Sequence, residues 1–358
     1  MILSSFVNCR KLTITDLECT DVGFVTRHTK VLKGNSMNHG QGLQKNVGAT
    51  PLNAGKGSLI EAIGKTPLVT LGSLNENPKV RIVAKLEGNN PGGSIKDRPA
   101  YYMIAKAEES GELTHGKTIL EATSGNTGIA LAMIGAARNY RVKLAMPACV
   151  SMERRRILEA YGAEVVLSPA EQGTDGAIML AHQILSENPD TYYMPNQYAN
   201  ENNVLAHYET TGPEIFAQTG GEIDVFVAGM GTTGTLMGVG KYLKEKNSRI
   251  RIVGVEPKIG HKIQGLKNMK EAIVPPIYQP DKLDEKNTIE DDDAFETARV
   301  LAIREGLFVG MSGGAAIACA LQLARKMDSG TIVTILPDRG DRYLSTTLFR
   351  SFCACCPP

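Results

Sequence analysis

Short apolar segments alternate with longer amphipathic segments along the chain from residue 58 onward. Strand-like apolar segments lie at 66–71, 80–86, 118–121, 142–146, 164–167, 223–228, 251–256, 307–309 and 331–336. Helix-like segments lie at 58–63, 99–109, 129–137, from about 151, and at 175–185, 235–245, 291–305 and 314–326. Short apolar strands that alternate with helices predict an α/β protein whose mostly parallel sheet is covered on both faces.

Residues 1–57 lack this regular pattern and are rich in Gly, Asn, Thr and Lys. Asp16, Glu18 and Asp21 argue against an acid-poor transit peptide, and the segment has no apolar centre like that of a secretory signal. We therefore expect residues 1–57 to be a disordered N-terminal extension. Its role stays open, organellar targeting included. Residues 350–358, which contain a Cys-rich cluster, are expected to form a C-terminal tail.

Composition excludes several classes of function. The 358 residues suffice for two domains or one large one, and 39 Lys and Arg nearly cancel 38 Asp and Glu. This balance gives no global field that would recruit nucleic acid or an anionic membrane. No apolar run approaches the ~20 residues of a membrane span. The seven cysteines form neither a disulfide framework nor the paired Cys-x-x-Cys spacing of a zinc site, so no metal is expected.

The loop from Gly88 to Arg98 is the first candidate for chemistry. It follows the strand-like segment 80–86, and Pro99 suits the first turn of the helix that follows. Lys96 would then lie at a helix N-terminus, which disfavours an ammonium and lowers the pKa of the amine, as a Schiff-base lysine requires. The alternative is an ordinary solvated lysine before Asp97 and Arg98.

Two further loops have the same position after a strand and before a helix, where open α/β sheets bind ligands. Thr123-Ser-Gly-Asn-Thr-Gly128 offers hydroxyls, an amide and helix N–H groups for a carboxylate or ring oxygen. Its alternative role is an ordinary helix cap. The small residues at 231–235 suit a phosphate.

A dinucleotide site is a rival interpretation of the third loop. Gly229 to Gly234 spells G-x-G-x-x-G after a strand, and Glu256 ends the next strand at the ribose-binding distance. That interpretation, an NAD-binding dehydrogenase, leaves Lys96 and the 123–128 loop without a role, and the fingerprint lacks a second mononucleotide half. Glu256 would otherwise be an ordinary residue at a strand end.

The loops together resemble the fold-type-II pyridoxal-phosphate (PLP) enzymes of the cystathionine β-synthase family, and within them the cysteine synthases (O-acetylserine sulfhydrylases). The resemblance runs from about Ser58 to Phe349. Its markers are Gly64–Leu68, Asn89–Arg98, Thr123–Gly128, Gln197-Tyr198, His207–Glu214, Gly231–Thr235, Gly310–Gly314 and Arg342–Phe349. Thr233 and the Asn-Asn-Pro before Lys96 are similar to the B-type isoform, whereas Gly260–Gly265 is similar to the A-type.

The resemblance implies the role of each candidate residue. Lys96 would carry PLP as an internal aldimine and act as the catalytic base. The remaining cofactor-binding residues would be Asn126 at the ring hydroxyl, Ser312 at the pyridine nitrogen, and Gly231, Thr232, Thr233, Gly234 and Thr235 at the phosphate. The substrate carboxylate would be held by Thr123, Ser124, Gly125, Thr127 and Gln197. A neutral Ser at the pyridine nitrogen favours β-elimination over reactions that need a full quinonoid.

The implied reaction is a ping-pong β-replacement in cysteine biosynthesis. O-acetyl-L-serine loses acetate to give an aminoacrylate intermediate, and sulfide or a related sulfur donor adds to form L-cysteine. Residues 199–203 depart from the family's Asn-Pro-Ala-Asn pattern, and together with the mixed isoform features they leave the sulfur donor open. The alternatives within the class are cystathionine β-synthase, cysteine desulfhydrase and lanthionine chemistry. An alternative of another class is a protein that binds serine acetyltransferase.

The resemblance also implies two fold-type-II domains, each with a mostly parallel sheet covered by helices. The larger, PLP-binding domain would comprise residues 58–88 and 200–349, and a smaller mobile domain residues 89–199. We further expect a homodimer in the cytoplasm, with serine acetyltransferase as a candidate partner.

Overall fold

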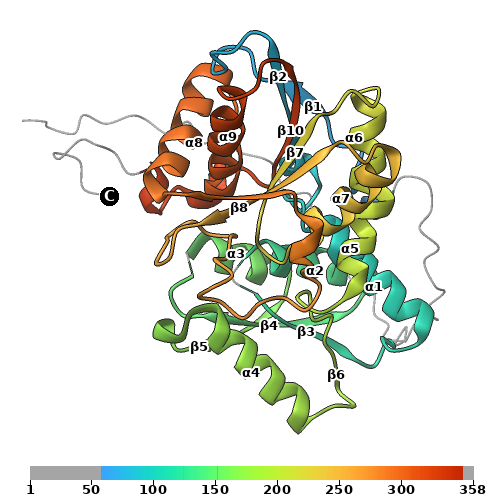
Figure 1. Ribbon diagram of the computed structural model, residues 1–358. Coiled ribbons are helices and arrows are strands. Elements are labelled where there is room, and N and C mark those ends of the chain that lie inside the picture. The colour runs from blue at the N-terminus through green and yellow to red at the C-terminus, as the bar shows by residue number, and fades with distance from the viewer. Residues whose placement is uncertain (1–57, 124, 151, 350–358) are drawn as a thin grey trace, which may run out of the picture. The chain divides into compact units, whose positions relative to one another are not determined.

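The computed structural model describes residues 58–123, 125–150 and 152–349 (Figure 1). The expected N-terminal extension and C-terminal tail lie outside these residues, as do Ser124 and Ser151. The strands form two sheets. The larger sheet has the order β1 (Leu68–Thr70), β2 (Val80–Leu86), β10 (Gly330–Leu336), β7 (Val225–Gly229), β8 (Arg251–Pro257) and β9 (Glu285–Ile289). The smaller sheet has the order β5 (Glu164–Ser168), β4 (Arg141–Pro147), β3 (Thr118–Ala122) and β6 (Tyr192–Tyr193).

Both sheets are parallel apart from one edge, where β1 pairs antiparallel with β2. The helices are α1 (Asp97–Ser110), α2 (Asn126–Arg138), α3 (Met152–Ala160), α4 (Gly173–Glu187), α5 (Glu201–Ala206), α6 (Gly212–Gln218), α7 (Gly234–Lys246), α8 (Asp291–Glu305) and α9 (Met311–Ala324). A π-helical turn, His207–Thr211, joins α5 to α6.

Alternate residues of each central strand are buried in different cores. In β7, Val225 and Val227 pack with α8 and α9, whereas Phe226 packs with residues of α6 and α7. Figure 1 shows these two helix pairs on opposite sides of the larger sheet. In β3 of the smaller sheet, Ile119 packs with residues of α1 and α2, and Leu120 packs with α4. Because side chains alternate across a strand, this double burial explains why the strands are almost continuously apolar.

The structure confirms the predicted α/β class with mostly parallel sheets covered by helices. The predicted strand 307–309 is wrong, because this segment contains only an isolated bridge between Val309 and Arg339. The sequence analysis missed β9, an edge strand that reads Glu-Lys-Asn-Thr-Ile and has no apolar run. The division into a larger and a smaller domain stays a prediction.

Among the helices that begin earlier than their apolar pattern suggests, three carry residues of the candidate site at or next to their first residue. Helix α1 begins at Asp97, so that Lys96 is its N-cap residue. Helix α2 begins at Asn126 and α9 at Met311, which places Asn126 and Ser312 in first helical turns. The described helices include none that is long and apolar enough to cross a membrane.

Candidate active site

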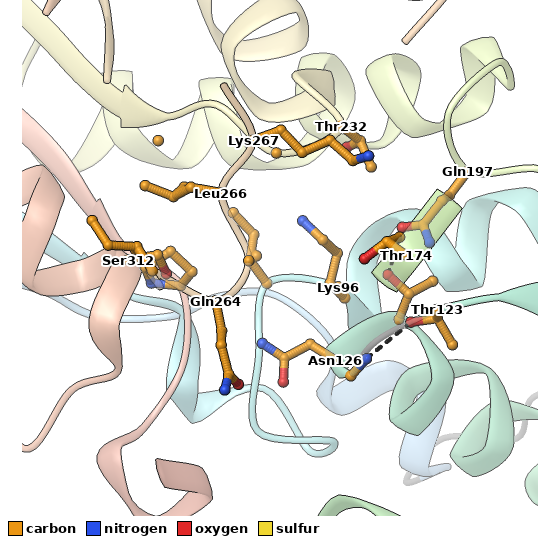
Figure 2. A pocket seen from close by; sticks show the side chains of 18 of the residues that line it. Lys96, Thr123, Asn126, Thr174, Gln197, Thr232, Gln264, Leu266, Lys267 and Ser312 are labelled. Atoms are coloured by element: carbon orange, nitrogen blue, oxygen red, sulfur yellow. Dashed lines mark hydrogen bonds between the residues drawn. The ribbon is translucent and has the colours of Figure 1, made fainter. Parts of the chain in front are cut away.

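The loops that follow strands of both sheets line one pocket of about 420 Å³. Lys96 comes from the loop after β2, Asn126 from the loop after β3, and Thr232 from the loop after β7. Figure 2 shows Lys96 near the middle of the pocket, between Asn126 and Thr232. All the predicted site residues that the structure describes line this pocket, except Gly234. Ser124 lies outside the described residues.

Lys96 is half-buried, and its amine has no polar partner in the described part of the chain. Its backbone N–H donates to Ser94 Oγ at 3.2 Å, but its Nζ has neither a hydrogen bond nor an ion pair with any described residue. Burial lowers the pKa of Lys96 below its ordinary value, while the negative charges of Asp338 and Glu87 oppose this shift. An amine with a lowered pKa is neutral, and therefore nucleophilic, over a wider pH range.

Buried charges fix the backbone on both sides of Lys96. Asp97 Oδ2 accepts the Gly92 N–H at 2.5 Å, and a Cβ at Gly92 would lie only 2.5 Å from Asp97 Oδ1. Arg98 pairs with Glu87 at 2.8 Å and with Glu214 at 2.7 Å. Because Arg98 and its two partners join the segment to the turn after β2 and to α6, the position of Lys96 does not depend on contacts of its own side chain.

The segment Gly231–Thr235 forms a cradle at the N-terminus of α7. Thr233 has φ +69° and its hydroxyl is buried without a hydrogen-bond partner among the described residues. A Cβ at Gly231 would lie 2.6 Å from the Gly265 carbonyl oxygen, and a Cβ at Gly234 would lie 2.1 Å from Asn203 Oδ1. Asn203 Nδ2 donates to Thr232 Oγ1 at 3.0 Å.

Such a cradle fits a phosphate group. The N-terminus of a helix presents unpaired backbone N–H groups to an anion, and glycines let the backbone approach it closely. The unpartnered Thr233 hydroxyl is a further donor that an anionic oxygen would satisfy. The residues of this loop therefore fit the phosphate of PLP, as the sequence resemblance implies.

The polar residues after β3 form a second group. Thr127 Oγ1 donates to Gln197 Oε1 at 2.6 Å, and Gln197 Nε2 donates to the Ala122 carbonyl at 3.2 Å. Thr123 Oγ1 accepts the backbone N–H groups of Gly125 at 3.2 Å and Gly128 at 3.3 Å. The capping role considered for this loop thus belongs to Thr123, and the hydroxyl of Thr127 is held by a residue from outside the loop.

The Asn126 side chain lies between two charged residues that follow β10. Its Nδ2 donates to Asp338 Oδ2 at 2.6 Å, and its Oδ1 accepts from Arg342 Nη1. Ser312, from the first turn of α9, is 5% exposed and lines the same pocket. A hydroxyl and an amide, both neutral, thus face the pocket beside Lys96.

Arg154 and Lys267 also line the pocket, although neither was expected as a site residue. Arg154 is the first of three consecutive arginines in the charged helix α3. It is 5% exposed, lines the pocket, and its guanidinium lies 5.2 Å from the centre of the Tyr343 ring. Lys267 lies 5.0 Å from the Tyr198 ring, and its Nζ is 3.7 Å from Asp175. Neither contact has a signal in the local sequence.

The dinucleotide interpretation receives no support from the geometry. Glu256 Oε1 pairs with Lys286 at 2.9 Å, and Oε2 accepts the Met269 N–H at 3.4 Å. Its carboxylate is therefore already engaged, and Glu256 does not line the pocket. Within the described part of the chain, no group of three His, Cys, Asp or Glu residues is arranged to hold a metal ion.

Comparisons with known proteins agree with this site. Residues 59–338 match the family described as pyridoxal-phosphate dependent enzymes. Cysteine synthase B of Salmonella typhimurium is 48% identical over 292 residues, which are 82% of this chain and 96% of that protein. Cysteine synthase of Aquifex aeolicus is 45% identical over 307 residues, which cover 84% of this chain and 94% of that protein.

The crystal structure of a cysteine synthase from Entamoeba histolytica superimposes with a TM-score of 0.78 at 40% identity. The match covers 84% of this chain and 93% of that one. With the family match over most of the chain, the high identity to cysteine synthases, and a pocket whose residues fit PLP, the chain belongs to the pyridoxal-phosphate-dependent enzymes, within the cysteine synthases.

Proposed function

We propose that this pocket performs the cysteine synthase reaction with the residue roles expected from the sequence. In this reaction the bond from Cβ of O-acetyl-L-serine to the acetate oxygen breaks, and a bond from Cβ to sulfide sulfur forms. The products are L-cysteine and acetate. The observation that carries the proposal is the amine of Lys96, which lacks a polar partner among the described residues and lies in the same pocket as a phosphate cradle.

PLP supplies the electron sink that stabilises negative charge at the substrate Cα. The N–H groups and hydroxyls of Gly231–Thr235 would hold its phosphate, with the N-terminus of α7 adding a favourable dipole. Ser312 would meet the ring nitrogen with a neutral hydroxyl rather than a carboxylate, and Asn126 would donate to the ring oxygen. Lys96 would provide the covalent attachment through its amine.

The loop Thr123–Thr127 would bind the carboxylate of the amino-acid substrate. Hydroxyls and backbone N–H groups at a helix N-terminus stabilise an anion without any cation. Gln197 positions the hydroxyl of Thr127 through their 2.6 Å hydrogen bond and is in turn held by the Ala122 carbonyl. The substrate would therefore be oriented by groups whose own positions are fixed.

Lys96 would also remove the α-proton, once the substrate amine has taken its place on the cofactor. The lowered pKa favours the unprotonated amine, which is the form that can accept a proton. Apolar residues of the lining, among them Ile95, Val150 and Leu266, would limit the water that competes with sulfide at Cβ.

A visible absorption spectrum of the purified protein tests this function. We expect a band from bound PLP that changes when O-acetyl-L-serine is added and returns when sulfide follows, with L-cysteine and acetate as products. A protein without any visible band, whose addition quenches NADH fluorescence, would contradict the proposal and favour the dinucleotide alternative. Loss of the band in Lys96→Ala under the same loading conditions would assign the attachment site.

The second substrate deserves its own measurement, because similar folds accept different ones. Solved structures that resemble this chain include an O-ureido-L-serine synthase at 39% identity and an O-acetylserine dependent cystathionine β-synthase from Helicobacter pylori at 37% identity. Competition between sulfide and homocysteine for the O-acetylserine-treated enzyme would separate the two activities. We expect sulfide to be consumed faster, and faster consumption of homocysteine would favour cystathionine synthesis.

Three further expectations rest on the family alone. A homodimer, binding of serine acetyltransferase and a cytoplasmic location are predictions. Sedimentation of the purified chain and its co-purification with serine acetyltransferase would test the first two. A pull-down that survives Lys96→Ala would separate partner binding from catalysis.

A further inference from the structure

Two oppositely charged residues hold the two ends of the Asn126 carboxamide. Asp338 Oδ2 accepts from Asn126 Nδ2 at 2.6 Å, and Arg342 Nη1 donates to Asn126 Oδ1. Both charged side chains are buried, with exposures of 2% for Asp338 and 7% for Arg342. They belong to the segment after β10, whereas Asn126 begins α2 beside the smaller sheet. The contact therefore joins residues that follow strands of different sheets.

The donors and acceptors of these partners determine the orientation of the Asn126 amide. A guanidinium has only donors, so it can meet only the carbonyl end of Asn126. A carboxylate has only acceptors, so it can meet only the NH₂ end. An amide turned by 180° would place two donors against each other at Arg342 and two acceptors against each other at Asp338. Buried groups mismatched in this way are costly, and the orientation seen here is the only one that satisfies both partners.

Both charged residues are themselves anchored. Tyr343 Oη donates to Asp338 Oδ2 at 2.5 Å, and the backbone of Asp338 forms a bridge with Ser94, close to Lys96 in the chain. Arg342 Nη2 donates to the Gly92 carbonyl in the same loop. Asp338 also acts on Lys96 by charge, because it opposes the lowering of the Lys96 pKa. The residues that hold Asn126 are thus themselves held in place by hydrogen bonds.

One hydrogen of the Asn126 NH₂ group is left over. An amide nitrogen carries two donors, and among the described residues only Asp338 accepts from Asn126 Nδ2. Asn126 and Lys96 both line the pocket (Figure 2).

We propose that Asp338 and Arg342 are positioning residues, which fix the Asn126 amide so that its second N–H donates to the ring oxygen of the bound cofactor. This inference rests on the proposed function, since it needs PLP in the pocket. It assigns to two residues outside the predicted site a role that acts entirely through Asn126. Asp338→Asn and Arg342→Gln remove the charges but keep similar shapes. A neutral amide at either position satisfies both orientations of Asn126, so the donor is no longer enforced.

The test compares two cofactors that differ by one atom. PLP and 3-deoxypyridoxal 5′-phosphate, which lacks the ring oxygen, are titrated separately into the full-length chain freed of cofactor. Binding is followed by absorbance and protein fluorescence, so that the readout does not depend on turnover. A hydrogen bond to a charged group contributes enough for the wild type to prefer PLP by about tenfold or more. We expect this preference to fall toward unity in Asp338→Asn and Arg342→Gln, with the affinity for the deoxy analogue nearly unchanged.

Asp341→Asn and Arg339→Gln are matched controls from the same segment. The side chains of Arg339 and Asp341 are 62% and 50% exposed and pair with each other at 3.2 Å, and among the described residues neither has a hydrogen bond with Asn126. We expect both controls to keep the full preference for PLP. Equal losses of affinity for both cofactors in Asp338→Asn and Arg342→Gln would overturn the inference, because a purely structural role does not distinguish the ring oxygen.

A swapped pair separates folding from positioning. Asn126→Asp alone places two carboxylates in contact, and we expect it to lower the melting temperature. Asn126→Asp combined with Asp338→Asn restores an amide–carboxylate hydrogen bond and a partner for Arg342, so the melting temperature should recover. The pocket then meets an acceptor, and the preference for PLP should stay lost. Recovery of the preference together with the melting temperature would contradict the inference. A wild type that binds neither cofactor would instead refute the proposed function.

Discussion

Lys85 in β2 and Lys96 in the loop that follows it differ in the polar contacts of their amines. For both, burial is the main cause of a pKa below the ordinary value. Lys85 is fully buried in β2, and its Nζ contacts Glu214 at 2.9 Å, the Thr66 carbonyl at 2.8 Å and Gln218 Oε1 at 2.9 Å. Lys96 has no polar partner for Nζ among the described residues and faces the pocket.

The difference shows that burial alone does not make a reactive lysine. An ammonium has three donors, and the contacts of Lys85 satisfy all three, so that its charge is held in place. Lys96 is desolvated without such compensation, which favours its neutral, nucleophilic form. A buried lysine whose amine has all its hydrogen-bond partners thus stabilises the fold. A buried lysine whose amine has none is available for reaction.

The largest expected effect is the loss of activity in Lys96→Ala. Removing the amine removes both the attachment point of the cofactor and the proposed base, so L-cysteine formation should fall by about 10³-fold or more. Product analysis in the presence of added PLP measures this directly. Because the Lys96 amine has no polar contact with the residues that the structure describes, the free energy of unfolding of the cofactor-free chain should change by less than about 1 kcal/mol.

Activity retained within tenfold in Lys96→Ala would contradict the assignment of Lys96. The unfolding measurement is the internal control, because a large drop in stability would mean that Lys96 has structural contacts like those of Lys85.

For the second prediction, at Lys85, we expect a large loss of stability and little loss of activity. Lys85→Ala removes one polar contact each from Glu214, Gln218 and the Thr66 carbonyl and opens a cavity, so the free energy of unfolding should fall by about 3 kcal/mol. Lys85→Met fills the cavity and should be less destabilising. Urea unfolding of both variants measures the difference. Catalytic turnover of the fraction that stays folded should remain within a few-fold of the wild type.

Equal stability of Lys85→Ala and the wild type would remove the distinction between the two lysines. Equal destabilisation by Ala and Met would assign the effect to lost polar contacts rather than to the cavity.

The sequence places Lys96 correctly because its signals are local. Gly and Pro residues mark the loop, β2 precedes it, and β2 and α8 have the bounds that their apolar patterns predict. The contrast with Lys85 could not be predicted in the same way. Lys85 is one polar residue in an apolar strand, and its partners Glu214 and Gln218 lie far away in the chain.

The same limit applies to Arg154 and Asp338. Arg154 belongs to a charged helix, and its burial results from contact with Tyr343, which follows β10. Asp338 lies next to Asn126 only because the ends of β3 and β10 meet at the pocket. Periodicity indicates which face of an element is buried, but it does not indicate which polar groups the fold brings together.

The third prediction concerns Glu214, the carboxylate that pairs with Lys85. Burial alone would raise the pKa of Glu214, but hydrogen bonds and charge from Arg98, together with Lys85, hold it at about 2. A carboxylate with a lowered pKa in the folded state stabilises the fold above its ordinary pKa, and this contribution is lost as pH falls. Between about pH 4.5 and 2 the wild type should lose stability more steeply than Glu214→Gln, by up to about 1.4 kcal/mol per pH unit.

Urea unfolding of both proteins at several pH values between 2 and 6 measures this difference in slope. Parallel curves would mean that the pKa of Glu214 is the same in the folded and unfolded states. The contacts of Glu214 with Arg98 and Lys85 would then not favour its charged form. Glu222→Gln is the matched control, since the Glu222 side chain is 78% exposed and makes a surface pair with Arg81 at 3.5 Å. Its curve should follow that of the wild type.

The smallest expected effect is a shift in the pH at which Lys96 reacts with an acylating reagent. In the full-length chain freed of cofactor, Lys96 should be acylated with a midpoint below that of exposed lysines, because burial lowers its pKa and the pocket admits a small reagent. Lys85 has a lowered pKa as well, yet its amine is enclosed by three partners and should stay unmodified until the chain unfolds.

Peptide mapping by mass spectrometry after short pulses at a series of pH values measures both residues in one sample, and the exposed Lys79 provides the reference. Acylation of Lys85 and Lys96 at equal rates would show that their different contacts do not change the reactivity of the two amines. A midpoint for Lys96 equal to that of Lys79 would show that burial does not lower the pKa of Lys96.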